Sequence, residues 1–105
     1  MASLLDMFDV RGKSVIVTGG ASGIGRAYTE VMADNGARVC IFDMDAGNLD
    51  AVVAEIAGRG GDVWGQLVDV SDRPAMAAAF DAVAERHGKI DVVFANAGID
   101  AGPGF

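Results

Sequence analysis

The sequence predicts an α/β domain, the first half of a doubly wound parallel sheet with about four strands and three helices. Three observations lead to this fold class. Short runs of apolar, β-branched residues recur four times along the 105 residues, which is typical of buried strands. Segments with the apolar spacing of a helix separate these runs. Connections of that length join parallel strands, so the strands should be covered by helices on both faces.

The first strand is expected at residues 14–18, the run Ser-Val-Ile-Val-Thr. The next segment has the apolar spacing of one helical face, which predicts a helix packed on the sheet. Its apolar stripe consists of Ile24, Ala27, Tyr28, Val31 and Met32. Asn35 and Gly36 should end this helix, because glycine readily adopts the left-handed conformation that closes many helices.

The second unit repeats this plan. Residues 38–42 should form a strand that Asp43 closes, and the glycines within residues 58–61 should stop the helix that follows. The apolar stripe of that helix is Leu49, Val52, Val53, Ile56 and Ala57.

The third unit begins with a strand at residues 63–68 that ends at Asp69. Ser71 is expected to cap the third helix, with Pro74 in its first turn. This helix carries Met76, Phe80 and Val83 and stops at Gly88. A fourth strand at residues 91–95 then leads into Asn96, and the tail to residue 105 should be a loop.

Composition excludes several classes of protein. The net charge is −7, with Lys and Arg scattered singly, so a nucleic-acid partner is not expected. No apolar block is long enough to span a membrane, and the N-terminus does not resemble a signal peptide, which favours a cytoplasmic protein. Cys40 is the single cysteine; it should be a buried apolar residue, and it rules out an internal disulfide or a multi-cysteine metal site. Residues 1–105 are expected to form part of one domain, with no linker.

The turn from Thr18 to Gly25, Thr-Gly-Gly-Ala-Ser-Gly-Ile-Gly, carries most of the functional information. It lies between a buried strand and a helix, where unpaired N–H groups and the helix dipole favour an anion. Glycines let the backbone approach a diphosphate closely, and a side chain at Gly23 or Gly25 should obstruct the cofactor or push the helix away from the strand. Glycine-rich turns of this kind also occur without a nucleotide.

This turn resembles the TGxxxGxG signature of the short-chain dehydrogenase/reductase family, and Asn96-Ala97-Gly98 resembles that family's NAG element. The resemblance extends from Gly12 to Gly98 and implies a Rossmann-type fold that binds a nicotinamide dinucleotide. The expected cofactor-binding residues are Gly19, Ser22, Gly23, Ile24, Gly25, Asp43, Met44, Asp69, Val70, Asn96, Ala97 and Gly98.

Asp43 predicts the choice of cofactor. A carboxylate that follows the second strand can accept hydrogen bonds from both hydroxyls of an adenosine ribose, and it repels a 2′-phosphate. Positions 44 and 22 are Met and Ser, so neither supplies a compensating cation. NAD is therefore expected rather than NADP. The alternative is that Asp43 is a solvated turn residue or a cap for the next helix.

Two other polar residues have two interpretations each. By resemblance, Asp69 contacts the adenine amino group and Val70 lies beside the base; alternatively, Asp69 forms a turn before Ser71. Asn96 should lie near the adenosine, and its side chain can equally hold the fourth strand through bonds to the backbone.

The catalytic pair that the resemblance implies, Tyr-x-x-x-Lys, is absent. Tyr28 is the single tyrosine, and Met32 stands where the Lys would be. The chain is therefore expected to be the cofactor-binding part of a longer oxidoreductase, inactive alone, with no catalytic and no metal-binding residues of its own. The parent should transfer hydride between the cofactor and a small-molecule alcohol or ketone, as a dimer or tetramer. The alternatives are an S-adenosylmethionine-dependent methyltransferase and a non-catalytic nucleotide-binding module.

Four other conspicuous side chains are expected to be structural. His87 falls in the last turn of the third helix, where a partly charged imidazole suits the helix dipole. Trp64, Phe80 and Tyr28 are expected to pack in the core.

Overall fold

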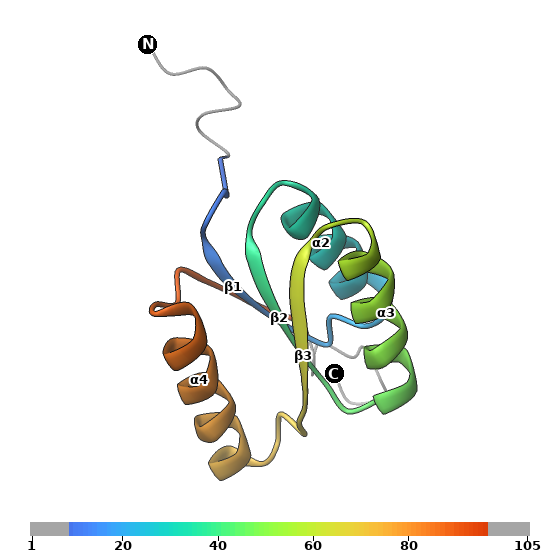
Figure 1. Ribbon diagram of the computed structural model, residues 1–105. Coiled ribbons are helices and arrows are strands. Elements are labelled where there is room, and N and C mark those ends of the chain that lie inside the picture. The colour runs from blue at the N-terminus through green and yellow to red at the C-terminus, as the bar shows by residue number, and fades with distance from the viewer. Residues whose placement is uncertain (1–8, 97–105) are drawn as a thin grey trace.

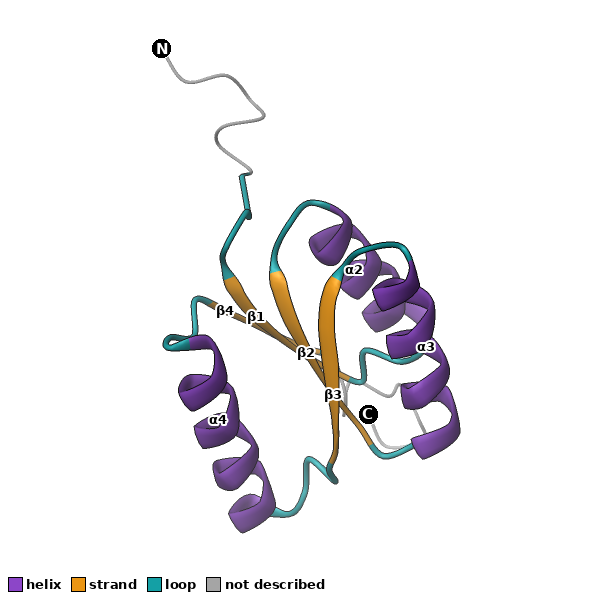
Figure 2. Cartoon of the chain, in the orientation of Figure 1, coloured by secondary structure: helices purple, strands orange, loops and turns teal. Residues whose placement is uncertain are grey.

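Four parallel strands form one sheet in the computed structural model, which describes residues 9–96. In sequence order they are β1 (Ser14–Thr18), β2 (Arg38–Asp43), β3 (Asp62–Leu67) and β4 (Val92–Ala95). The order in the sheet is β3-β2-β1-β4, so the chain extends the sheet on one side of β1 and then returns to place β4 on the other (Figure 2). Thr18 is level with Phe42 and with Ala95. The carboxyl ends of three strands therefore share one edge.

The helices of this part of the chain lie on both faces of the sheet, as Figure 1 shows. α2 (Gly23–Asp34) and α3 (Ala46–Gly58) cover one face, and α4 (Arg73–His87) covers the other. Side chains alternate along β1 to match: Val15 and Val17 pack on the side of α2 and α3, and Ile16 packs on the side of α4. The predicted α/β fold class is confirmed.

Coverage of the sheet is uneven. Every residue of β1 is buried, whereas exposure alternates along β4, where Val93 is 45% exposed. Helices therefore leave part of β4 uncovered in the described residues. The reason is the position of α4, whose apolar cluster takes in Ile16 and Phe42 and no residue of β4.

The apolar stripe expected on α2 is only partly the buried face. Met32 is buried, but Ile24 is 73% exposed and Val31 is 58% exposed. The buried residues of this helix are Gly25, Thr29, Met32 and Ala33. The helix thus turns Gly25 toward the backbone that follows β1, where a Cβ would lie 2.2 Å from the Gly19 carbonyl oxygen. Tyr28 packs as expected, with its ring stacked on Phe94 at 4.1 Å between centroids.

Several predicted boundaries move by one residue. β3 begins at Asp62 and ends at Leu67, β2 includes Asp43, and β4 begins at Val92. The N-cap of α4 is Asp72 and not Ser71: the Asp72 carboxylate accepts a hydrogen bond from the Ala75 N–H at 3.1 Å. Ser71 does not fill this role because α4 begins at Arg73, which makes residue 72 the N-cap position; the Ser71 N–H and hydroxyl donate to Asp69 instead.

His87 lies in the last turn of α4 as predicted, but the expectation of a partly charged imidazole is wrong. The residue is buried, and its Nε2 accepts a hydrogen bond from Trp64 Nε1–H at 2.9 Å. An accepting Nε2 requires a neutral ring with its proton on Nδ1, which lies 2.7 Å from the Ser14 hydroxyl. Burial, together with the positive charge of Arg38, lowers the pKa of His87. Trp64 and Phe80 are half-buried against the apolar cluster under α4, in agreement with their expected packing role.

Candidate functional site

The turn between β1 and α2 has backbone geometry that favours glycine. Gly19 and Gly23 have φ angles of +67° and +56°, which residues with a side chain rarely adopt. The Gly19 N–H donates to the Phe42 carbonyl at 2.7 Å, so the turn begins by extending the pairing of β1 with β2. The chain then reverses over the carboxyl edge of the sheet and enters α2.

Gly25 is the point of closest contact between α2 and the turn. A Cβ atom at this position would lie 2.2 Å from the Gly19 carbonyl oxygen and 2.8 Å from Asn96 Nδ2. The structure thus supports the expected close approach of helix and strand at Gly25. A Cβ at Gly23 would meet open space instead, so the constraint at Gly23 is its backbone conformation.

The first turn of α2 presents backbone N–H groups in a favourable setting for an anion. Ser22 occupies the N-cap position with extended backbone, yet its side chain makes no capping hydrogen bond, and no acidic residue lies in the first turn. Ser22, Gly23 and Ile24 are exposed. The positive end of the helix dipole and its N–H groups therefore remain available to a negatively charged ligand.

Asp43 lies at the end of β2, directly beside this turn. One carboxylate oxygen, Oδ2, accepts a hydrogen bond from the Ala21 N–H at 3.1 Å. The other, Oδ1, accepts from the Asp45 N–H at 2.9 Å. The cap of α3 is the neighbouring Asp45, whose side chain accepts from the Asn48 N–H. Asp43 is thus not the helix cap, and it has a defined orientation beside the turn.

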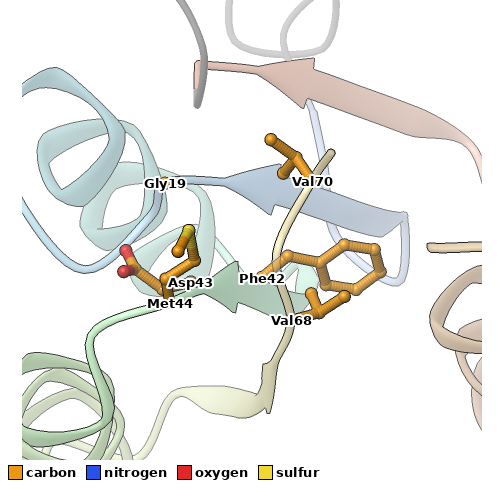
Figure 3. A pocket seen from close by; sticks show the side chains of 6 residues that line it. All are labelled: Gly19, Phe42, Asp43, Met44, Val68 and Val70. Atoms are coloured by element: carbon orange, nitrogen blue, oxygen red, sulfur yellow. The ribbon is translucent and has the colours of Figure 1, made fainter. Parts of the chain in front are cut away.

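A shallow hollow opens between the turn and the end of β3, as Figure 3 shows. Its lining residues are Gly19, Phe42, Asp43, Met44, Val68 and Val70. The structure therefore brings together four predicted residues from three separate segments. Phe42 and Val68 were not predicted, although each stands next to or near a predicted residue at a strand end. Apart from Asp43 the side chains here are apolar, and they offer a surface suited to a flat aromatic base.

Asp69 and Asn96 both make bonds that define the backbone. Asp69 Oδ1 accepts from the Ser71 N–H at 2.9 Å and from its hydroxyl at 2.7 Å, and these bonds lower the pKa of Asp69. The turn-forming interpretation of Asp69 is therefore supported. The Asn96 N–H donates to Thr18 Oγ1 at 2.9 Å, and its Nδ2 donates to the Gly19 carbonyl at 3.3 Å. Asn96 thus ties the end of β4 to the end of β1. Ala97 and Gly98 lie outside the described residues.

Residues 9–96 lack two further features. This part of the chain contains no cluster of three or more His, Cys, Asp or Glu side chains suited to a metal ion. It also contains no helix with the length and apolar character needed to cross a membrane.

Comparison with known proteins identifies the family. The family model described as short chain dehydrogenase matches residues 13–105. D-threitol dehydrogenase of Mycolicibacterium smegmatis is 42% identical over 94 residues, which cover 88% of this chain and 36% of that protein. The chain spans about a third of the length of several of the curated relatives it matches.

Solved structures agree with this assignment. A short chain dehydrogenase/reductase from Burkholderia phymatum, in complex with NAD, superposes with a TM-score of 0.79 at 36% identity, over 83% of this chain and 31% of the other. A metagenomic short-chain oxidoreductase in complex with NADP gives a TM-score of 0.76 at 35% identity, over 81% and 38% of the two chains.

Proposed function

This chain belongs to the short-chain dehydrogenase family, and we propose that it forms the NAD-binding part of an oxidoreductase. The reaction of the whole protein is hydride transfer between the nicotinamide cofactor and a small-molecule alcohol or ketone. The observation that carries this proposal is the Asp43 carboxylate, oriented at the end of β2 beside the glycine turn.

The residues of the site fit the parts of a dinucleotide. The turn and the first N–H groups of α2, at Gly23, Ile24 and Gly25, receive the diphosphate, with Ser22 at its side. Asp43 accepts hydrogen bonds from the adenosine ribose, and the adenine lies in the hollow. The base-contacting residues proposed in the hollow are Met44, Val68 and Val70, with Asp69 between the two valines in the chain. Gly19 and Asn96 are proposed to lie beneath the adenosine, and the predicted contacts of Ala97 and Gly98 fall outside the described residues.

The side chains around Asp43 favour NAD over NADP. A 2′-phosphate would lie close to the Asp43 carboxylate, and neither Met44 nor Ser22 carries a positive charge. Arg26, in the first half of α2, is already paired with Glu30 and Glu55. Because solved relatives with this fold include one NAD and one NADP complex, these local charges, and not the fold, are expected to decide the preference.

The chain itself contributes binding and orientation. When bound, a nicotinamide dinucleotide supplies the hydride chemistry. The family's Tyr-x-x-x-Lys pair has no match in this sequence, so the groups that move the substrate proton are proposed to come from outside these 105 residues. A methyltransferase or a non-catalytic module is not favoured, because the match to the dehydrogenase family model covers residues 13–105.

Cofactor affinity of the full-length protein tests this proposal. Calorimetry should show that the wild type binds NAD more tightly than NADP. Asp43→Ala should weaken NAD binding by about 10- to 100-fold, the effect of losing hydrogen bonds to a charged group, and should reduce the preference. Asp81→Ala, which removes the same charge from an exposed position on α4, should leave both affinities unchanged. An unchanged preference in Asp43→Ala would refute the assignment.

A further inference from the structure

We infer that Asp43 has a second role: its carboxylate holds the glycine turn in its binding conformation before the dinucleotide arrives. The sugar and diphosphate parts of the site are then coupled through one side chain. This inference rests on the proposed function and goes beyond it, because it assigns Asp43 a contribution to binding that needs no sugar hydroxyl.

The hydrogen bond to Ala21 is the basis of this role. Ala21 lies in the middle of the turn and is only 3% exposed, so its N–H has little access to water. Asp43 Oδ2 accepts from this N–H across 22 positions of sequence. Removal of the carboxylate would leave a buried donor without its partner, which favours a different conformation of the turn.

Most other contacts hold the two ends of the turn; its middle also has the Thr29 hydroxyl of α2, which lies 3.4 Å from the Gly20 carbonyl oxygen. At the start, the Gly19 N–H donates to Phe42 and the Gly19 carbonyl accepts from Asn96. At the far end, the Thr29 hydroxyl donates to the Gly25 carbonyl at 2.8 Å. Asp43 is therefore the group that links the middle of the turn to β2.

The two roles of Asp43 are compatible. A carboxylate has about four lone-pair positions, and the Ala21 and Asp45 N–H groups occupy one on each oxygen. One position on each oxygen remains for the two ribose hydroxyls. Because the backbone bonds orient the carboxylate in advance, binding does not have to restrict its rotation.

A ligand without sugar hydroxyls separates the two roles. We propose measuring the binding of 2′,3′-dideoxy-ADP and of ADP to full-length Asp43→Asn and Asp43→Ala. Both variants lack the negative charge. They differ in one group: Asn keeps a side-chain oxygen that can accept a hydrogen bond from the Ala21 N–H, and Ala does not. The Asp45 N–H lies in an exposed residue and can bind water instead.

We expect dideoxy-ADP to bind Asp43→Asn roughly 2- to 10-fold more tightly than Asp43→Ala, the effect of one hydrogen bond. Without ligand, the Ala21 amide should exchange with solvent faster in Asp43→Ala than in Asp43→Asn. Asp45→Ala is the matched control: it removes a carboxylate two residues away whose hydrogen bonds go to Asn48, and it should bind dideoxy-ADP like the wild type.

The outcomes distinguish this inference from the proposed function. Equal affinity of Asp43→Asn and Asp43→Ala for dideoxy-ADP, with equal exchange at Ala21, overturns the coupling role and leaves NAD binding intact. A wild type that binds neither NAD nor ADP overturns the proposed function. If Asp43→Ala does not fold, Asp43→Val replaces it, because valine suits a strand, approximates the shape of aspartate and has no acceptor; the same comparison with Asp43→Asn then decides.

Discussion

The two ends of the sheet use polar residues in opposite ways. At the carboxyl end, Asp43 and Asn96 bond to backbone groups of the glycine turn, and Asp43 lines an open hollow. At the amino end, Ser14, His87 and Trp64 bond to one another in a half-buried to buried chain. At the same end, the Arg38 guanidinium donates a hydrogen bond to the His87 carbonyl oxygen at 3.0 Å.

This difference indicates that the polar residues at the carboxyl end serve ligand binding, whereas those at the amino end serve folding. The polar groups of the amino end are mutually satisfied, so they join α4 to β1 and β3 and leave nothing for a ligand. Those of the carboxyl end shape the backbone and keep free acceptor and donor positions. Changes at the carboxyl end should therefore affect cofactor binding, and changes at the amino end should affect stability alone.

Gly25→Ala should have the largest effect and should disrupt the carboxyl end. Its Cβ would lie 2.2 Å from the Gly19 carbonyl oxygen, a backbone contact that can be relieved only by moving α2. We expect the free energy of unfolding to fall by about 3 kcal/mol and NAD binding to be lost, as measured by urea denaturation and calorimetry. Gly58→Ala is the control, since a Cβ there meets no atom within 4 Å. Normal stability and affinity in Gly25→Ala would contradict the packing described.

Ser14→Ala should have an intermediate effect on stability, and it tests whether the two ends of the sheet are independent. It leaves the Nδ1–H of His87 buried without an acceptor, because Nε2 must continue to accept from Trp64. The free energy of unfolding should fall by about 2 kcal/mol while the NAD dissociation constant of the full-length protein stays unchanged. Ser71→Ala, which removes an exposed hydroxyl, should have a smaller effect on stability. A change in NAD affinity in Ser14→Ala would show that the two ends are not independent.

Mild acid should have the smallest effect on the free energy of unfolding. His87 is the only histidine, and burial places its folded-state pKa below the ordinary value of 6.5. Its neutral form therefore adds stability that is fully present above pH 6.5 and is lost as the pH falls from there through the folded pKa. The slope for one proton cannot exceed about 1.4 kcal/mol per pH unit.

Urea denaturation between pH 7.5 and 5 would measure this slope. The charged groups that act on the pKa of His87 are Arg38 on β2, Asp62 on β3 and Arg86 on α4. His87→Phe should remove the slope. The same slope in His87→Phe would assign it to another group.

Much of the fold could be predicted because local chemistry and tertiary contacts agree. The runs at β1 and β2 are apolar on both faces, and both strands are buried as expected. The prediction failed on α2, where apolar spacing alone did not show which residues face the sheet. Ile24 and Val31 have the spacing of a buried stripe, yet they are exposed, and the buried face of α2 contains Gly25 and Thr29 instead.

The candidate site, like the fold, could be predicted only in part. The order and spacing of glycines, Asp43 and Asn96 indicated the site because each follows a strand, and parallel strands bring their carboxyl ends to one edge. Spacing could not show that Asp43 bonds to Ala21, that Phe42 and Val68 line the hollow, or that His87 is a neutral acceptor.

The sequence by itself determined the alternation of strands and helices and the places where the chain turns, because these depend on residues that are neighbours along the chain. The tertiary structure decided which face of α2 is buried, which backbone N–H groups each carboxylate accepts from, and the protonation of His87. These depend on atoms that are distant in sequence, such as Gly19 and Gly25 facing Asn96, and they are set only when the strands assemble side by side.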